Sequence, residues 1–333
     1  MKAIVCTKFG LDGLKFEENP KPSPRDNEVL VKIYASSVNY NILAYISGKP
    51  IFARLMGVGL LKPKVKIPGG DIAGRVEAVG KDIMQFQPGN EVFGNSDGCG
   101  FGAFAEYVAV PENVLAFKPI NVSFEEAAAA VQAAVVALQG LRKGKIQSGQ
   151  KVLIYGASGG IGTFAVQIAK SFGAEVTGVC STKNLDFVRS IGADHVIDYT
   201  KQDFTKNGQH YDLILTTAGY RSIFDYKRAL GPKGIYVMVG GSMRGEKAMV
   251  QIYQAWFLGP LLSMTGSKKL RILSAAPNKQ DLVFVKELME AGKVKSIIDK
   301  RYPLGEVAEA SRYYEERHAR GKVVITVVGD DKK

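Results

Sequence analysis

From Lys151 onward, short apolar runs alternate with runs of helical character, and this alternation most constrains how the chain folds. Such alternation is typical of βαβ units, which build a parallel sheet with helices on its faces. The pattern predicts strands at 152–155, 175–180, 195–198, 213–216, 235–239 and 270–274, and helices at 161–172, 184–191 and 281–291. We therefore expect an α/β class with a doubly wound parallel sheet.

A glycine-rich loop joins the first of these strands to its helix. Glycines permit a tight turn and a close backbone approach, while the N-terminus of the helix offers amides to a pyrophosphate. An alanine replaces the first glycine of the usual dinucleotide fingerprint, but strand, loop and helix occur in the required order. The predicted cofactor-binding residues of the loop are Ala157, Ser158, Gly159, Gly160, Ile161 and Gly162.

The end of the second strand indicates which dinucleotide the chain binds. An NAD site carries an acidic residue about 20 residues after the loop, where it accepts hydrogen bonds from the adenosine ribose. This chain has Ser181, Thr182 and Lys183 there, and hydroxyls with an ammonium suit a 2′-phosphate. The residues favour NADPH. The alternative is that Ser181 and Thr182 only cap the following helix and Lys183 is solvated.

The N-terminal third follows a different pattern. Short strands are expected at 3–6, 28–35, 71–79, 91–93 and 105–110, and the Gly and Pro residues between them favour antiparallel or barrel-like packing. Ser123 and Glu126 then have the spacing of a capping box, and the alanine-rich sequence that follows them has high helix propensity. We expect a helix to begin here.

Charge and cysteine content limit the classes of partner and compartment. The formal net charge is +12, but the positive residues are scattered, and no nucleic-acid motif accompanies them. Weak contact with an anionic membrane surface is compatible with this charge. The three cysteines are far apart, which fits a reducing compartment, and there is no apolar run long enough for a membrane span. A cytoplasmic protein is expected.

Several further motifs accompany the glycine loop, namely Gly70-Asp-Ile-Ala-Gly-Arg-Val-Glu-Ala-Val-Gly80, Phe86-Gln-Pro-Gly-Asn-Glu-Val92, Gly102-Ala-Phe-Ala-Glu-Tyr107 and Gly321-Lys-Val-Val324. Together they resemble the medium-chain dehydrogenase/reductase family, more narrowly its zinc-free quinone oxidoreductase branch, which includes the chloroplast-envelope homologues. The resemblance implies a GroES-like, mainly β catalytic domain from residues 1–122 and 276–333. It also implies a Rossmann NADP-binding domain at 123–275.

The resemblance extends the set of expected cofactor residues. Ser181, Thr182, Lys183 and Tyr199 would surround the adenosine phosphate end, although Tyr199 fits a packed aromatic equally well. The carboxyl edge of the sheet would be lined by Ala218, Gly219, Gly240, Gly241 and Ser242.

The resemblance also indicates that the chain lacks zinc. Asn39 stands where the zinc alcohol dehydrogenases carry a cysteine ligand, and Gly70 stands where they carry a histidine. A catalytic zinc usually needs three protein ligands, so no metal is expected. Two further departures, Ile42 and Val136, replace polar residues of many relatives.

Asn39 and Tyr40 resemble the segment of the family that faces the substrate, and either could donate a hydrogen bond to a carbonyl or quinone oxygen. The alternative is a structural turn. Two apolar stretches, 51–61 and 250–264, could line a substrate or form core or dimer contacts.

The expected function is NADPH-dependent hydride transfer to quinones or α,β-unsaturated carbonyls. The alternatives are a zinc-free NADP-dependent alcohol dehydrogenase and a membrane-peripheral nicotinamide-binding protein with secondary activity. A homodimer is expected through the strand at 270–274.

Overall fold

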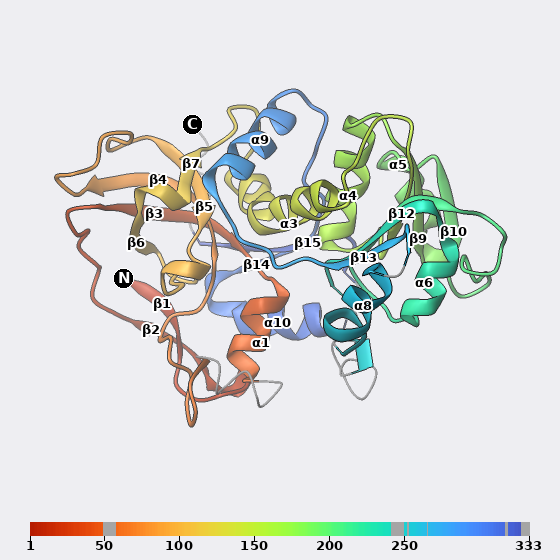
Figure 1. Cartoon of the computed structure of the whole chain (residues 1–333). Coiled ribbons are helices and arrows are strands. Elements are labelled where there is room, and N and C mark those ends of the chain that lie inside the picture. The colour runs from red at the N-terminus through yellow and green to blue at the C-terminus, as the bar shows by residue number, and fades with distance from the viewer. Residues whose placement is uncertain (49–57, 241–249, 252, 265, 317–318, 328–333) are drawn as a thin grey trace. The chain divides into compact units, whose positions relative to one another are not determined.

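The computed structural model describes residues 1–48, 58–240, 250–251, 253–264, 266–316 and 319–327 (Figure 1). The chain divides into two compact units. The first comprises Met1–Gln132, Pro277–Glu290 and Ser296–Lys333, and the second comprises Ala133–Ala276 and Ala291–Lys295. One division falls inside helix α3 (Phe124–Lys143), beyond residue 122 where the sequence places the domain limit.

The second unit is built on a six-stranded parallel sheet in the order β10-β9-β8-β11-β12-β13. Its strands are β8 (Lys151–Tyr155), β9 (Glu175–Cys180), β10 (His195–Asp198), β11 (Tyr211–Thr216), β12 (Leu230–Met238) and β13 (Lys269–Ile272). The strand order reverses between β8 and β11, which is the arrangement of a doubly wound dinucleotide-binding sheet. The predicted parallel α/β sheet is confirmed.

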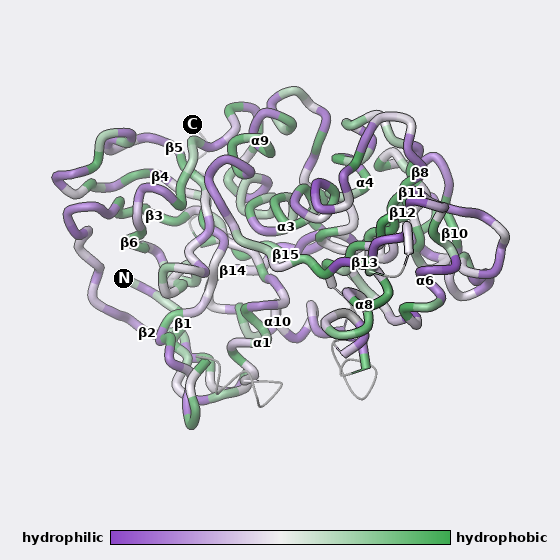
Figure 2. The backbone as a smooth tube through the Cα atoms, viewed as in Figure 1, coloured by the Kyte–Doolittle hydropathy of each residue, from purple (hydrophilic) through white to green (hydrophobic). Residues whose placement is uncertain are grey.

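Helices and short turns connect these strands. They are α4 (Gly160–Ser171), η5 (Thr182–Asn184), α5 (Leu185–Ser190), α6 (Ile223–Ala229), the π-helical turn η6 (Gln254–Leu258) and α8 (Gly259–Met264). The strands between them carry the apolar core, and Figure 2 shows this hydrophobic character along β8 and β11. Leu153 and Ile214 in these strands are completely buried.

Strand β12 begins earlier than the sequence predicts, at Leu230 instead of residue 235. The strand contains Pro232, and proline cannot donate to a strand ladder. In the structure Leu230 already pairs with Tyr211, and the register shifts before Leu213 pairs with Ile235. The proline is accommodated beside this irregularity.

The first unit contains a two-stranded sheet and a seven-stranded sheet. The strands are β1 (Lys2–Cys6), β2 (Leu14–Glu18), β3 (Glu28–Ser37), β4 (Asp71–Val79), β5 (Glu91–Asn95), β6 (Tyr107–Pro111), β7 (Leu115–Phe117), β14 (Ile298–Pro303) and β15 (Lys322–Thr326). Strand β15 pairs antiparallel with β3 and parallel with β14. The C-terminal part of the chain therefore completes the N-terminal sheet, as the resemblance implies.

The helices of the first unit are α1 (Tyr40–Ser47), the start of α3, α9 (Lys279–Glu290) and α10 (Val307–Glu315), with short turns at η1 (Leu11–Gly13), η3 (Asp97–Cys99), η4 (Glu112–Val114) and η7 (Leu304–Glu306). The predicted capping box of α3 is confirmed. The backbone N–H of Ser123 donates to Glu126 Oε2 at 2.8 Å, and the N–H of Glu126 donates to Ser123 Oγ at 3.1 Å. Within the described ranges, no helix is long and apolar enough to cross a membrane.

Candidate functional site

The glycine loop after β8 has a conformation that only glycine supports at two positions. Gly156 has φ of 90°, in the left-handed region. A Cβ at Gly162 would lie 2.0 Å from the carbonyl oxygen of Gly156, so a side chain there would displace helix α4 from the loop. These two glycines hold the loop against the start of the helix.

The loop presents backbone amides at the N-terminus of α4. Gly159 is the N-cap, and the amides of the first helical turn have no partner within the helix. The helix dipole adds a partial positive charge at the same place, which suits a pyrophosphate. Ala157 has a different role, because it is fully buried and its N–H donates to the carbonyl oxygen of Val179. This alanine fixes the loop to β9.

The carboxyl end of β9 carries Ser181, Thr182 and Lys183, as the sequence predicts. Ser181 is the N-cap of η5, but its hydroxyl makes no capping hydrogen bond, and Lys183 is exposed. Thr182 departs from the expectation, since its hydroxyl donates to Asp198 Oδ2 at 2.5 Å. The hydroxyl proton of Thr182, which we expected to bond to the 2′-phosphate of NADPH, is therefore bonded to Asp198.

Asp198 is an acidic residue beside this strand end that the sequence alone does not point to. It ends β10, and the parallel register places it opposite Cys180 at the end of β9. Its other oxygen accepts from the N–H and the hydroxyl of Thr200 at 3.0 and 2.7 Å. The hydrogen bonds from Thr182 and Thr200 lower the pKa of Asp198 and stabilise its charge. Although no acidic residue follows β9 directly, the neighbouring strand β10 therefore places one beside the end of β9.

The remaining predicted cofactor residues follow the ends of β10, β11 and β12. Tyr199 is 46% exposed, and its ring meets Tyr155 edge-on. Ala218 is exposed, whereas Gly219 has φ of 78° and leaves no room for a Cβ beside Tyr155. Gly240 follows β12, and its N–H donates to the carbonyl oxygen of Thr216. Gly241 and Ser242 lie outside the described residues.

The first unit contains a buried ionic cluster around Asp71, at the start of β4. Its Oδ2 accepts from the hydroxyl of Ser37 and from Asn39 Nδ2, the latter at 2.6 Å. Lys322 Nζ donates to Asn39 Oδ1 and lies 3.9 Å from Asp71 Oδ2. Burial raises the pKa of Asp71 and lowers the pKa of Lys322 to about 8. The lysine and the aspartate thus form a buried pair that Asn39 bridges.

Asp97, in η3, extends this cluster with a second carboxyl group. Its Oδ2 accepts from Asn41 Nδ2 and from Gln132 Nε2, the latter at 3.1 Å. A Cβ at Gly70 would overlap Asp97 Oδ1, so the carboxyl occupies the place of a side chain at position 70. Burial, with the nearby Asp71 charge, raises the pKa of Asp97 to about 7. Asp97 therefore takes up a proton near neutral pH.

Asn39 and Tyr40 occupy different environments. Asn39 is 7% exposed, and its amide is bonded to Asp71 and Lys322 at both ends. Tyr40 begins α1 and is 36% exposed. Asn39 thus makes structural contacts, although with the side chains of Asp71 and Lys322, and the catalytic assignment of Asn39 and Tyr40 stays a prediction.

Apolar side chains remain exposed in the second apolar stretch. Trp256 is 59% exposed, Phe257 66% and Leu261 57%. Residues 51–57 of the first stretch lie outside the described residues. The exposed aromatic residues are available for contact with a ligand or another subunit.

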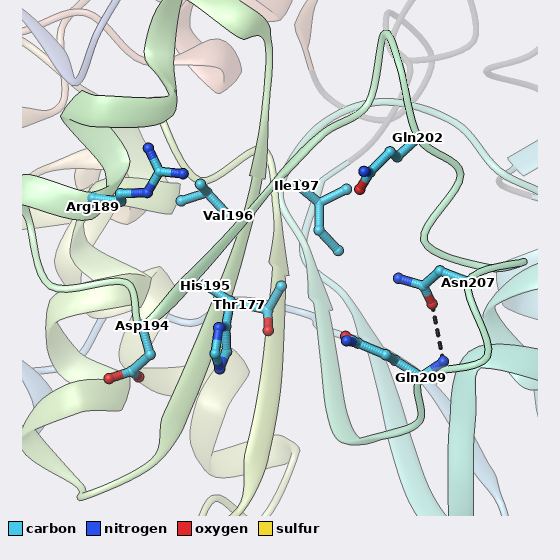
Figure 3. Close-up of a pocket in the computed structure, with 9 residues that line it drawn as sticks. All are labelled: Thr177, Arg189, Asp194, His195, Val196, Ile197, Gln202, Asn207 and Gln209. Atoms are coloured by element: carbon cyan, nitrogen blue, oxygen red, sulfur yellow. Dashed lines mark hydrogen bonds between the residues drawn. The ribbon is translucent and has the colours of Figure 1, made fainter.

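A polar pocket of about 310 Å³ lies along β10 and the loop that follows it (Figure 3). Its walls include Arg189, His195 and Asn207, and Asn207 Oδ1 accepts from the N–H of Gln209 at 3.0 Å. None of the predicted cofactor and catalytic residues that the structure describes lines this pocket. It is therefore separate from the candidate cofactor site.

Two family models match the chain. The alcohol dehydrogenase GroES-like domain matches residues 25–120, and the zinc-binding dehydrogenase model matches residues 191–325. The chloroplast envelope quinone oxidoreductase homolog of Arabidopsis thaliana is 30% identical, over 98% of this chain and 98% of that protein. The chain belongs to the medium-chain dehydrogenase/reductase family. Within this family it is placed in the quinone oxidoreductase branch, as the motifs predict.

Two further members of the family are similar over nearly the whole chain. The chloroplastic NADPH-dependent alkenal/one oxidoreductase of Arabidopsis thaliana is 31% identical, over 98% of this chain and 79% of that protein. The solved structure of the quinone oxidoreductase from Coxiella burnetii has a TM-score of 0.84 and 26% identity, covering 98% of this chain and 99% of that one. The predicted combination of GroES-like and Rossmann domains is thereby confirmed.

Proposed function

We propose that this member of the family is an NADPH-dependent oxidoreductase that reduces quinones or α,β-unsaturated carbonyl compounds. The observation that carries the proposal is the glycine loop of the second unit, next to a strand end with Ser181 and Lys183. The names of the relatives, which include a quinone oxidoreductase homolog and an NADPH-dependent alkenal/one oxidoreductase, support this substrate class.

The residues of the second unit fit NADPH. The backbone amides of the first turn of α4 would bind the pyrophosphate. Ser181 and Lys183 would bind the 2′-phosphate, while Thr182 holds Asp198 by its hydroxyl proton. When bound, NADPH supplies a hydride to a quinone or to the β-carbon of an enone.

Two residues of the first unit are assigned to stabilising the charge on the substrate oxygen. Hydride addition places two electrons on the substrate and leaves negative charge on its oxygen. Tyr40 donates a hydrogen bond to that oxygen, and Asn39 fixes the start of α1 through its bonds to Asp71 and Lys322. Solvent supplies the proton that completes the reduction.

The function is tested with NADPH deuterated at C4 and a panel of quinones, enones and simple aldehydes. We expect NADPH oxidation with the first two classes and deuterium at the β-carbon of the reduced enone. Reduction of simple aldehydes alone would instead favour the zinc-free alcohol dehydrogenase. Binding of NADPH without turnover of any substrate would favour the nicotinamide-binding protein.

Removing the hydroxyl of Tyr40 tests the proposed oxygen donor. Tyr40→Phe should lower kcat by up to about a hundredfold, because a preorganised donor to a developing oxyanion contributes about that much. The Kd for NADPH should not change, since Tyr40 is not a proposed cofactor ligand. Steady-state kinetics and fluorescence titration measure the two quantities. An unchanged kcat would assign the oxygen to another donor.

Lys183→Ala tests the proposed 2′-phosphate contact. A charge-assisted hydrogen bond contributes about 1.5–3 kcal/mol, so NADPH binding should weaken by about ten- to a hundredfold. NADH binding should be unaffected. Titration calorimetry with both cofactors measures this difference. The control is Lys151→Ala, at the end of β8 that lies away from the glycine loop. An equal loss for both cofactors would contradict the assignment.

One of the matching family models describes zinc-binding dehydrogenases, but the residues of this chain do not fit a catalytic zinc. Position 39 supplies an amide already bonded to Lys322, and the carboxyl of Asp97 fills the place beside Gly70. The buried Lys322 ammonium would also repel a cation. We expect no stoichiometric metal in the active protein by elemental analysis. Loss of activity with a chelator and its return with zinc would contradict this expectation.

The proposed assembly is a homodimer. Among the described residues, strand β13 is at the edge of the six-stranded sheet and pairs only with β12. An unpaired edge favours association with a second subunit. We also propose a cytoplasmic location, with weak contact of the basic chain to anionic membrane surfaces.

A further inference from the structure

We propose that Asn184 is a positioning residue that orients two serine hydroxyls, those of Ser158 and Ser181, toward the phosphates of NADPH. This inference rests on the proposed function, because it concerns the same cofactor site. It adds a residue that contributes to the preference for the 2′-phosphate without touching the cofactor.

The geometry brings three segments of the second unit together. Ser158 belongs to the glycine loop, Ser181 follows β9, and Asn184 closes the short turn η5. Asn184 Nδ2 lies 3.1 Å from Ser158 Oγ and 3.3 Å from Ser181 Oγ, and it donates to both. The backbone N–H of Asn184 also donates to the carbonyl oxygen of Ser181 at 2.9 Å. One side-chain amide thus links the two places where phosphates are expected.

The side-chain amide of Asn184 is buried, and its nitrogen makes the hydrogen bonds that hold it in place. Asn184 is 6% exposed, so its side chain has little freedom to turn toward solvent. Its Oδ1 is also buried, and no donor within the described residues bonds to it. A buried acceptor without a partner has a cost in free energy. We infer that the two bonds made by Nδ2 offset this cost and fix the orientation of the amide.

This orientation determines what the serine hydroxyls can do. An amide nitrogen has two N–H groups and accepts nothing, whereas a serine oxygen accepts while keeping one O–H to donate. Because both serine oxygens accept from Asn184, each O–H remains directed to another acceptor. Phosphate oxygens are such acceptors, and serine O–H groups commonly donate to them. Asn184 therefore makes both hydroxyls donors at the same time.

An isosteric change tests this polarity. Asn184→Asp replaces the donating nitrogen by a carboxylate oxygen, to which both serines would donate their protons. The serine hydroxyls then no longer donate to the phosphates, and the new carboxylate places a negative charge beside the phosphate sites. We expect the Kd for NADPH to rise at least tenfold. The Kd for adenosine 2′,5′-bisphosphate, a probe that carries both phosphates, should rise in the same way.

A double-mutant cycle separates positioning from a merely structural role. Asn184→Ala should weaken binding of NADPH in the otherwise intact protein. It should have no further effect once Ser158→Ala and Ser181→Ala are already present, because the residue acts through them. The control is Asn207→Ala, which removes a loop asparagine of the same unit and should leave every Kd unchanged. The cycle uses only alanine variants, so it still tests the inference if Asn184→Asp does not fold.

Calorimetric titration of the full chain with NADPH, NADH and the bisphosphate probe gives distinct outcomes. A wild-type chain that does not bind NADPH would overturn the cofactor assignment itself. A wild-type chain that binds NADPH, with an Asn184→Asp variant of equal affinity, would overturn only the inference about Asn184. Additive effects in the cycle, or a lower Tm with unchanged Kd, would also overturn it.

Discussion

Lys322→Met should destabilise the first unit by about 3–5 kcal/mol, because it leaves a buried carboxylate without its counter-charge. Asp71 is fully buried, and Lys322 is 1% exposed. The lysine also donates to the carbonyl oxygen of Val38 at 3.1 Å and to Asn39 Oδ1. Methionine has a similar length but makes none of these interactions. Denaturant unfolding of the full chain at pH 7 measures the loss.

Two further variants identify the cause of this destabilisation. Lys286→Met removes an ion pair on the surface of α9, where Nζ lies 2.7 Å from Glu290 Oε2, and it should cost less than about 1 kcal/mol. Adding Asp71→Asn to Lys322→Met should restore part of the lost stability, since it removes the uncompensated charge. If Lys322→Met lowered the free energy of unfolding no more than Lys286→Met does, the buried pair would not stabilise the fold.

Asp97→Asn should remove a pH dependence of stability between about pH 4 and pH 7. Burial, followed by the charge of Asp71, raises the pKa of Asp97 from 3.8 to about 7 in the folded chain. The unfolded chain releases this proton first, so stability falls as the pH rises through this window and is level above it. The upper limit of the loss is about 4 kcal/mol, at roughly 1.4 kcal/mol for each pH unit.

Asparagine imitates the protonated form of Asp97. Two nearby acceptors, Asn41 Oδ1 and Gln132 Oε1, are buried and receive no donor from the described part of the chain. The side-chain amide that Asp97→Asn introduces would offer N–H groups to this region, as the carboxylic acid offers its proton. We therefore expect the variant to unfold at a higher temperature than the parent chain at pH 8, and at a similar temperature at pH 4.

A second carboxylate provides a control of opposite sign. Although partial burial opposes the effect, hydrogen bonds from Lys170 and from the N–H of Val176 lower the pKa of Asp194. Its stabilising contribution is therefore present near neutral pH and is lost in acid. Asp194→Asn should destabilise the chain at pH 8 and have a smaller effect at low pH. A stability profile of Asp97→Asn parallel to that of the parent would show that Asp97 does not take up the proton.

Features that depend on residues close together in the chain follow from the sequence. The loop Gly156–Gly162 needs small residues in a fixed order between a strand and a helix, and the pattern identified Gly162, where the structure leaves no room for a side chain. The capping box of Ser123 and Glu126 is equally local. Apolar alternation also indicated the parallel sheet, because each strand and helix must bury one face.

Contacts between polar side chains that are distant in the sequence depend on how the strands pair. Lys322 reaches Asn39 because β15 pairs with β3, and Asp198 reaches Thr182 because β10 is in register with β9. Asn184 bridges two strand ends in the same way. None of these contacts has a characteristic spacing in the sequence, since strand order and register set them. Burial shifts the pKa values of Asp71 and Lys322, whereas hydrogen bonds shift the pKa of Asp198, and both causes arise only when the sheets are assembled.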